Sequence, residues 1–391
     1  MKKNIVKIAA ALFFAALVAG VAIAAPAKKN ASSGTVKIVT DIFPVYDWVR
    51  EITKNSAAKI DLTLLLDNGV DLHSYQPAVA DVAKIAECDL FVYVGGESEG
   101  WMDDACKEIK NKNSVVLKLL DSLGDAAKEE EVVEGMEADH DHESADEHDH
   151  EHEHESAGEH HHEHGEDEEG PEYDEHIWLS VKNAKILCNT IAEKIAAVDP
   201  KNAQTYRANA AAYNAKLSSL DAQYQKIVDA ASKKTVLFGD RFPFRYLVDD
   251  YGLSYYAAFV GCSAETEASF KTILFLAKKV DELGIPAVLT IEKSDGKIAK
   301  TIIKNTKAKN QKILTLDSMQ STTSNDVKRH KKRHHLSVDY DEKRRRVEIG
   351  AAVKRFRRNA LRVRSVCGAF CICKRAFLEA VWHCSLVKTY R

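Results

Sequence analysis

Residues 199–230 read DPKNAQTYRANAAAYNAKLSSLDAQYQKIVDA, and this stretch decides how the chain is organised. Its apolar residues recur at steps of three and four, which predicts one face of a long helix; they are Tyr206, Ala210, Tyr213, Leu217, Leu220, Tyr224 and Ile227. At 1.5 Å per residue this helix is roughly 40 Å long. Pro200 suits the first helical turn and Asp199 the capping position before it. We expect a stiff connector, unlike the loop hinges that permit wide closure.

Short β-rich runs alternate with helical runs on both sides of this helix. Before it, the sequence predicts strands at 36–40, 60–66, 90–94 and 115–119 and helices at 45–54 and 78–88. After it, the predicted strands are 235–238, 254–259, 287–291 and 312–316, with helices at 269–283 and 297–306. This rhythm is typical of α/β folds with parallel sheets flanked by helices. We therefore expect two α/β lobes, residues 35–180 and 233–328, joined by a helical region at 181–232.

The composition describes a globular chain whose regions differ in charge. The 391 residues are 45% hydrophobic and 29% charged, which excludes a wholly disordered chain and a disulfide mini-protein. Residues 129–175 contain 23 Asp or Glu and no Lys or Arg, whereas residues 329–391 contain 18 Lys or Arg against 5 Asp or Glu. The formal net charge of -4 is an average over these regions, so it gives no information about the kind of partner that the protein binds.

The N-terminus resembles an export signal. A basic start precedes an apolar run over 8–25, with an A-x-A cleavage motif at 22–24. Val21 stands where a lipoprotein would carry its Cys, so we expect no lipid anchor. We expect residues 1–25 to be removed and the mature protein to be periplasmic or extracellular. The alternative is an uncleaved anchor, because about 18 apolar residues is the lower limit for spanning a bilayer.

A histidine–acid tract lies within the acidic region. Its ten histidines are interleaved with Asp and Glu; they are His140, His142, His148, His150, His152, His154, His160, His161, His162 and His164. Imidazole and carboxylate are ligands for zinc and similar ions. Without Lys, Arg or apolar periodicity, residues 129–175 should form a solvated, flexible loop that collects metal ions with low affinity. The alternative is a charged linker whose histidines are incidental. An H-E-x-x-H match at 150–154 arises by chance from the repeated residue types.

Two further histidines lie outside the tract and the basic tail. His73 lies in residues 69–77, GVDLHSYQP, which form the loop before a predicted helix. His176 lies in residues 174–180, DEHIWLS, just after the acidic region. A single histidine in a loop is usually unremarkable, so neither residue alone indicates a metal site.

Three motifs in order carry a resemblance to a known family. V-D-x-H-x-Y-x-P around His73, D-x-H-I-W-L-S around His176, and Asp199-Pro200 before the long helix resemble the zinc/manganese solute-binding proteins of ABC importers (cluster A-I, the zinc-uptake periplasmic binding proteins). The resemblance covers residues 35 to about 328. It implies two α/β lobes with one transition-metal ion in the cleft between them. It also implies delivery of the ion to a membrane permease driven by a cytoplasmic ATPase.

The resemblance further implies four metal ligands. The motif matches carry His73 and His176 over as two of them, and Asp317 matches the family's acid after the last strand. The third position, His or Glu in the family, falls on Arg241, which does not ligate a cation. If the correspondence with the family is shifted by one residue, Asp240 occupies this position, and we expect Asp240 to be the ligand.

The third ligand has alternatives. Asp240 could instead pair with Arg241 or Arg245, in which case another acid would ligate the metal. The reserve candidates are Glu265, Glu267 and Glu292.

The ligand set and the tract together predict the metal. Two His and two carboxylates suit Zn²⁺ or Mn²⁺, so the set alone does not choose. The tract favours zinc, because imidazole is a good ligand for Zn²⁺ and Mn²⁺ prefers oxygen ligands. We expect a monomeric, high-affinity zinc receptor that delivers its ion to a permease and binds no nucleic acid. We expect no catalysis, since no nucleophile motif, phosphate loop or dinucleotide fingerprint is found. The alternatives are a manganese receptor of the same family, and a zinc buffer or an adhesin.

The composition changes abruptly near residue 328. Residues 329–391 hold 12 arginines, against four in the preceding 328 residues, and half of the cysteines: Cys367, Cys371, Cys373 and Cys384. We interpret this tail as a reading-frame shift that removes the family's closing helix. The alternatives are a genuine extra segment and a basic arm for nucleic acid or anionic membranes. The remaining cysteines are scattered, and one or two disulfides are compatible with their number; they are Cys88, Cys106, Cys188 and Cys262.

Overall fold

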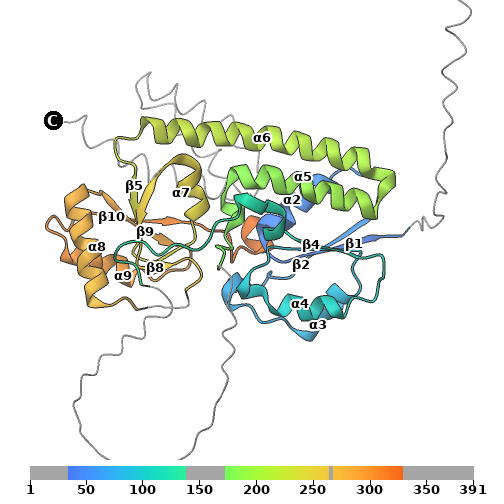
Figure 1. The fold of residues 1–391 in the computed structure, drawn as a ribbon, viewed down its shortest axis with the longest axis horizontal. Coiled ribbons are helices and arrows are strands. Elements are labelled where there is room, and N and C mark those ends of the chain that lie inside the picture. The colour runs from blue at the N-terminus through green and yellow to red at the C-terminus, as the bar shows by residue number, and fades with distance from the viewer. Residues whose placement is uncertain (1–33, 138–171, 264–266, 329–391) are drawn as a thin grey trace, which may run out of the picture. The chain divides into compact units, whose positions relative to one another are not determined.

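The computed structural model describes residues 34–137, 172–263 and 267–328 (Figure 1). The chain from Thr35 onward forms a unit of its own, apart from Met1–Gly34. The predicted export signal, the histidine tract, Glu265 and the basic tail lie outside the described residues.

The first lobe is built on a four-stranded parallel sheet. Its strands lie in the order β2 (Ile60–Leu64), β1 (Val36–Thr40), β3 (Leu90–Tyr93) and β4 (Val115–Lys118). Helices α2 (Phe43–Thr53) and α5 (Val181–Val198) lie on one face, and α3 (Val79–Ala86) and α4 (Trp101–Lys107) lie on the other (Figure 1). A parallel sheet covered on both faces needs apolar residues on both sides of its strands, and every residue of β3 is buried.

The second lobe contains three pairs of parallel strands in place of one four-stranded sheet. The pairs are β5 (Thr235–Leu237) with β7 (Ser254–Tyr256), β9 (Ala287–Ile291) with β10 (Lys312–Leu316), and β6 (Arg241–Phe242) with β8 (Phe259–Val260), all parallel. A bridge from Phe238 to Leu289 links the first two pairs. The helices of this lobe are α7 (Arg245–Tyr251), α8 (Phe270–Leu283) and α9 (Lys297–Asn305). The predicted α/β class with parallel sheets is confirmed.

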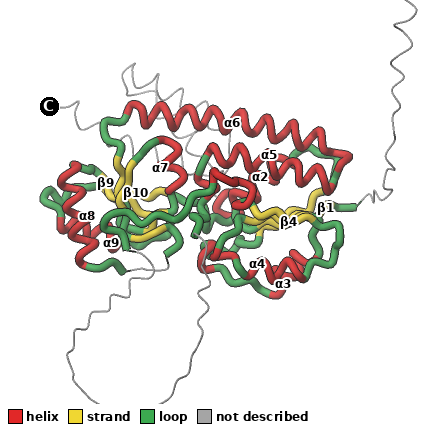
Figure 2. Tube along the Cα trace, viewed as in Figure 1, coloured by secondary structure: helices red, strands yellow, loops and turns green. Residues whose placement is uncertain are grey.

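The connector is helix α6 (Ala203–Ala230), which spans 28 residues (Figures 1 and 2). The turn at Pro200–Asn202 precedes it, and Asp199 accepts hydrogen bonds from the Asn202 amide and the Tyr206 hydroxyl. The apolar face predicted from the sequence is buried in the structure, except that Ile227 at its end is half-buried and the neighbouring Val228 is buried.

Helix α6 contacts elements of both lobes. Asn209 donates to the backbone carbonyls of Ile52 and Lys54 at the end of α2. Asp221 accepts from Lys185 of α5 and from Tyr251 of α7. Because one continuous helix holds partners in both lobes, it acts as a strut rather than as a hinge.

Part of the segment that we expected to be a flexible loop packs against the second lobe. Glu137 forms a bridge with Phe259 and donates its backbone N–H to the Ala258 carbonyl at 2.9 Å. The prediction was wrong for this portion, because Met136 is an apolar side chain that becomes buried there.

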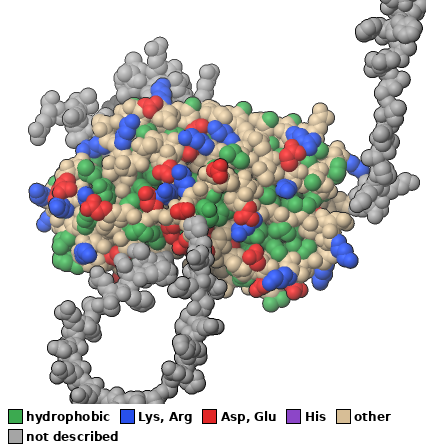
Figure 3. Space-filling view, in the orientation of Figure 1, with side chains coloured by type: hydrophobic (Ala, Val, Ile, Leu, Met, Phe, Trp, Pro, Cys, Tyr) green, Lys and Arg blue, Asp and Glu red, His purple; other side chains and the backbone are tan. Residues whose placement is uncertain are grey.

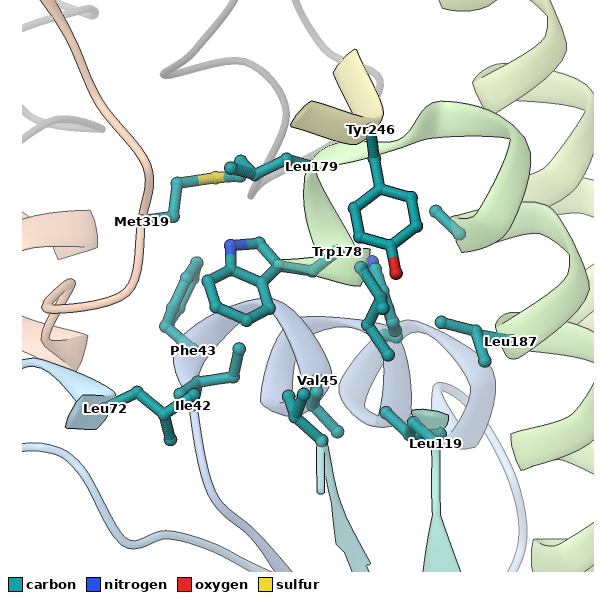
Figure 4. Close-up of a cluster of buried hydrophobic side chains, with 14 of the residues drawn as sticks. Ile42, Phe43, Val45, Leu72, Leu119, Trp178, Leu179, Leu187, Tyr246 and Met319 are labelled. Atoms are coloured by element: carbon teal, nitrogen blue, oxygen red, sulfur yellow. The ribbon is translucent and has the colours of Figure 1, made fainter. Parts of the chain in front are cut away.

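One hydrophobic cluster lies where the first lobe meets the chain after β10. Trp178 is fully buried in this cluster, and Phe43 and Met319 lie beside its indole, with Leu72 farther out next to Ile42 (Figure 4). Its indole N–H donates to the Ser318 carbonyl at 2.7 Å. This anchored indole fixes the backbone of η4 (Ile177–Leu179), directly after His176.

The surface mixes charges of both signs. On the face shown in Figure 3, Lys and Arg are interspersed with Asp and Glu, which is typical of a solvated surface. Among the described residues, the helices that reach 18 residues lack an apolar stretch sufficient to span a bilayer.

Candidate metal centre

Two histidines that are 103 positions apart in the sequence face each other. The Nε2 atoms of His73 and His176 are 3.0 Å apart, and the ring centroids are 4.9 Å apart. His73 lies in the short turn η1 (Leu72–Ser74), which Asp71 caps by accepting from the Ser74 N–H. His176 directly precedes η4, and Trp178 packs against its ring. Both rings are shielded from solvent: the side-chain exposures are 6% and 0%.

Each imidazole has polar partners at its other nitrogen. His176 Nδ1 is 3.0 Å from a carboxylate oxygen of Asp174. His73 Nδ1 is 2.7 Å from the Ser98 hydroxyl and 3.4 Å from a carboxylate oxygen of Glu175. An N–H on Nδ1 that donates to a carboxylate leaves the lone pair of Nε2 available for a metal, and this is the arrangement that orients histidine ligands in metal sites.

Cys262 is the third member of the group. The ligand atoms of His73, His176 and Cys262 all lie within 4.8 Å of one another. Burial, with the neighbouring carboxylates of Glu175 and Asp174, raises the pKa of the Cys262 thiol well above its ordinary value. The approach of this loop depends on Gly261, because a Cβ there would lie 2.9 Å from Cε1 of the His176 ring.

One further donor atom is near His176. The Gln320 side-chain oxygen is 3.3 Å from Nε2 of His176. Gln320 is buried and follows strand β10. An amide oxygen in this position is a candidate for the fourth place around an ion.

Buried carboxyls lie behind His73. Glu175 accepts from the Ser98 backbone N–H at 2.8 Å, and Gly96 makes room for it, since a Cβ there would lie 2.4 Å from its carboxylate. Burial acts to raise the pKa of Glu175, but the His73 ring beside it holds that pKa below its ordinary value. Burial and the charge of Asp41 raise the pKa of Glu99 well above its ordinary value. Burial also raises the pKa of Asp41 to about 7.

The two predicted acid ligands lie outside this group. Asp240 accepts from the Arg241 backbone N–H at 3.0 Å, and burial raises its pKa. Asp317 accepts from the Met319 backbone N–H at 2.8 Å. Neither carboxylate belongs to the group of His73, His176 and Cys262, whose ligand atoms lie within 4.8 Å of one another. The expected set of two His and two Asp therefore stays a prediction.

The described reserve acids, Glu267 and Glu292, likewise do not belong to this group. Glu292 accepts from the backbone N–H and the hydroxyl of Ser318. Burial and the neighbouring Asp317 raise the pKa of Glu292 to about 7. Glu267 is exposed.

Arg241 and Arg245 have partners other than the Asp240 side chain. The Arg241 guanidinium pairs with Asp71 at 2.9 Å and donates to the Ser263 carbonyl at 3.1 Å. Arg245 pairs with Glu131. Asp71 lies two residues before His73 and Ser263 directly after Cys262, so Arg241 ties together the loops that carry these two residues.

The sequence offered only a weak signal for Cys262. It is one of four scattered cysteines in the body of the chain, and no neighbouring motif marks it. These four cysteines form no disulfide in the structure. The signal that could have found Cys262 is the Gly-Cys pair that follows a predicted strand, where a side chain reaches the carboxyl edge of the sheet.

Comparisons with known proteins point to one family. The chain is 29% identical over 302 residues to the zinc-binding protein AdcA of Streptococcus pyogenes serotype M3, covering 77% of this chain and 54% of AdcA. It is 29% identical over 282 residues to the high-affinity zinc uptake system protein ZnuA of Bacillus subtilis, covering 72% and 79%. The chain thus spans about half the length of the AdcA relative.

A solved structure and a family model agree with these relatives. The Zn(II)-bound ZnuA-like domain of Streptococcus pneumoniae AdcA is 27% identical with a TM-score of 0.53, covering 75% of this chain and 92% of that domain. The model of the family described as zinc-uptake complex component A, periplasmic, matches residues 38–331. The chain belongs to this family of zinc-uptake solute-binding proteins.

Proposed function

We propose that this chain is an extracytoplasmic receptor that binds one zinc ion with high affinity and delivers it to the permease of an ABC importer. The observation that carries the proposal is the pair of shielded imidazoles with facing Nε2 atoms, each held from behind by a carboxylate. The zinc-binding names of its relatives point in the same direction.

The geometry of the pair suits a single ion. Two nitrogens bound to zinc at about 2.0–2.1 Å in a tetrahedral site lie roughly 3.4 Å apart. The 3.0 Å between the two Nε2 atoms needs to widen by only a few tenths of an ångström. Asp174 beside Nδ1 of His176, and the Ser98 hydroxyl beside Nδ1 of His73, keep the ring orientations during this adjustment.

The donor types favour zinc over manganese. Imidazole suits zinc, whereas manganese prefers carboxylate, carbonyl and water oxygens. A site filled by protein ligands also leaves no open position for a reacting water, as a structural rather than a catalytic zinc site would. We therefore propose binding and transfer without catalysis.

The remaining parts of the chain take supporting roles in this proposal. Residues 1–25 direct export and are removed, and lobes 35–180 and 233–328 enclose the ion. The histidine tract at 140–164 collects zinc with low affinity near the site.

The test compares zinc binding by the full chain and two matched variants. His73→Ala removes a proposed ligand, and His152→Ala makes the same chemical change within the tract. We expect one tight zinc ion per chain in the wild type and in His152→Ala, and loss of that tight site in His73→Ala. Tight binding that survives His73→Ala would contradict the proposed site. In cells, zinc uptake at low external zinc should fall with the same variant.

A further inference from the structure

We propose that Cys262 supplies the third metal ligand as a thiolate and that Arg241 positions the loop that carries it. This inference rests on the proposed metal-binding function and names the ligand set of that site. It also explains why the chain can carry Arg241 at the position where members of the family have their third ligand.

The distances place the sulfur within reach of an ion held by the histidines. The ligand atoms of His73, His176 and Cys262 lie within 4.8 Å of one another. In a tetrahedral zinc site, a sulfur at about 2.3 Å and a nitrogen at about 2.05 Å from the ion lie roughly 3.6 Å apart. Because 4.8 Å exceeds this value by roughly 1.2 Å, a closure of at most about 1.2 Å assembles all three donors.

The loop that bears Cys262 is shaped for this approach. Gly261 lies against the His176 ring and the Phe242 backbone carbonyl, where a Cβ would come within 2.9 and 3.0 Å respectively. Any larger residue would push the loop away from the imidazole. The glycine thus sets the sulfur beside the histidine pair.

Arg241 holds the two ligand-bearing loops from opposite sides. One guanidinium nitrogen donates to the Ser263 carbonyl at 3.1 Å, and the other pairs with Asp71 at 2.9 Å. The Asp71 carboxylate neutralises the guanidinium, so its charge does not oppose a cation nearby. Burial acts to raise the pKa of Asp71, but the Arg241 guanidinium holds that pKa below its ordinary value. Arg241 is thus a positioning residue and not a ligand.

Binding of the metal by Cys262 exchanges a proton for the metal ion at the sulfur. The Cys262 S–H bond breaks, a metal–sulfur bond forms, and the proton leaves to solvent. One thiolate and two imidazoles make a softer donor set than two imidazoles and two carboxylates. Soft thiolate ligands favour zinc and disfavour manganese, so Cys262 should determine metal specificity.

Cobalt(II) titration of the full chain tests the ligand assignment. Cobalt(II) bound to a thiolate shows a sulfur-to-metal charge-transfer band in the near ultraviolet. We expect this band in the wild type and in Cys106→Ser, a matched change on α4, and its loss in Cys262→Ser. Zinc affinity of Cys262→Ser should fall by more than the roughly 10–100-fold that an outer-shell partner costs. Its preference for zinc over manganese should shrink as well.

Alkylation of the wild type covers the case in which Cys262→Ser does not fold. Bound zinc should slow the labelling of Cys262 by iodoacetamide and leave the labelling of Cys106 unchanged. The extent of labelling at each cysteine is measured by peptide mass spectrometry. Tight one-to-one binding without a charge-transfer band or protection would overturn the thiolate ligand and leave the receptor function standing. Absence of any tight one-to-one binding would overturn the function itself.

The positioning role of Arg241 is tested separately, by the zinc affinity of Arg241 variants. Arg241→Gln should lower zinc affinity by about 10–100-fold while the cobalt charge-transfer band persists, and Arg241→Lys should recover part of the affinity. An unchanged affinity in Arg241→Gln would overturn the positioning role. Loss of the band together with unfolding, measured by circular dichroism, would indicate a merely structural role.

Discussion

The buried carboxyl of Asp41 should make the stability of the fold depend on pH. Asp41 follows β1 and is fully buried, and it accepts from the backbone N–H groups of Ile42 at 2.5 Å and Val94 at 2.6 Å. These bonds favour the carboxylate, but burial outweighs them and raises the pKa to about 7 from an ordinary value of 3.8. The unfolded chain therefore ionises first as the pH rises.

The sign and magnitude follow from this difference. The Asp41 contribution to stability is full below pH 4, declines as the pH rises to about 7, and is constant above that. Each pKa unit corresponds to 1.36 kcal/mol, so a shift of about 3 units corresponds to about 4 kcal/mol. Asp41→Asn abolishes the titration but weakens one backbone hydrogen bond, at a pH-independent cost of about 1–3 kcal/mol.

The assay is urea unfolding of wild type and Asp41→Asn at several values between pH 4 and pH 7, with a chelator present because bound metal stabilises the folded state. The free energy of unfolding of the variant relative to the wild type should rise by about 3 kcal/mol from pH 4 to pH 7. A difference that stays constant over this range would refute the reasoning.

Three other substitutions have defined outcomes. Ser180→Ala removes the cap of α5, which accepts from the Asn183 N–H at 2.9 Å, and should lower the free energy of unfolding by about 1–2 kcal/mol in urea; no change would show that the cap is dispensable. Leu217→Ala on α6 leaves a cavity at a fully buried position and should cost about 2–5 kcal/mol in the same assay; a cost below 1 kcal/mol would mean that the helix repacks. Gly261→Ala should displace the His176 ring and weaken zinc binding in a competition titration; wild-type affinity would contradict the close approach.

Much of the fold was predictable because its signals are periodic and local. The strand at 36–40 and the strands at 287–291 and 312–316 were predicted with the observed bounds. The short helices α4 and α7 were missed, since seven residues give too few turns for an apolar period to emerge. The sequence placed Ile227 on the apolar face, whereas the structure buries the neighbouring Val228, because both residues lie near the apolar stripe and packing against neighbours decides between them.

The site was less predictable because tertiary contacts assemble it. His73 and His176 stood out as isolated histidines in motifs, and the structure brings them together. Asp240 was chosen as a ligand because it is the carboxylate next to Arg241, the residue at the family's third ligand position. No feature of the sequence indicated that its side chain would accept from the Arg241 backbone N–H. The location of Cys262 depends on how the loop after β8 lies against a histidine from another segment, which no local pattern encodes.

We propose that the tightly bound ion lies between the lobes and not in the histidine tract. The most direct measurement is a competitive zinc and manganese titration of the chain lacking residues 139–169, beside the same chain carrying His73→Ala. We expect one tight, zinc-preferring site that survives removal of the tract and is lost with His73. Disappearance of tight binding with the tract alone would contradict the account and make the tract the binder.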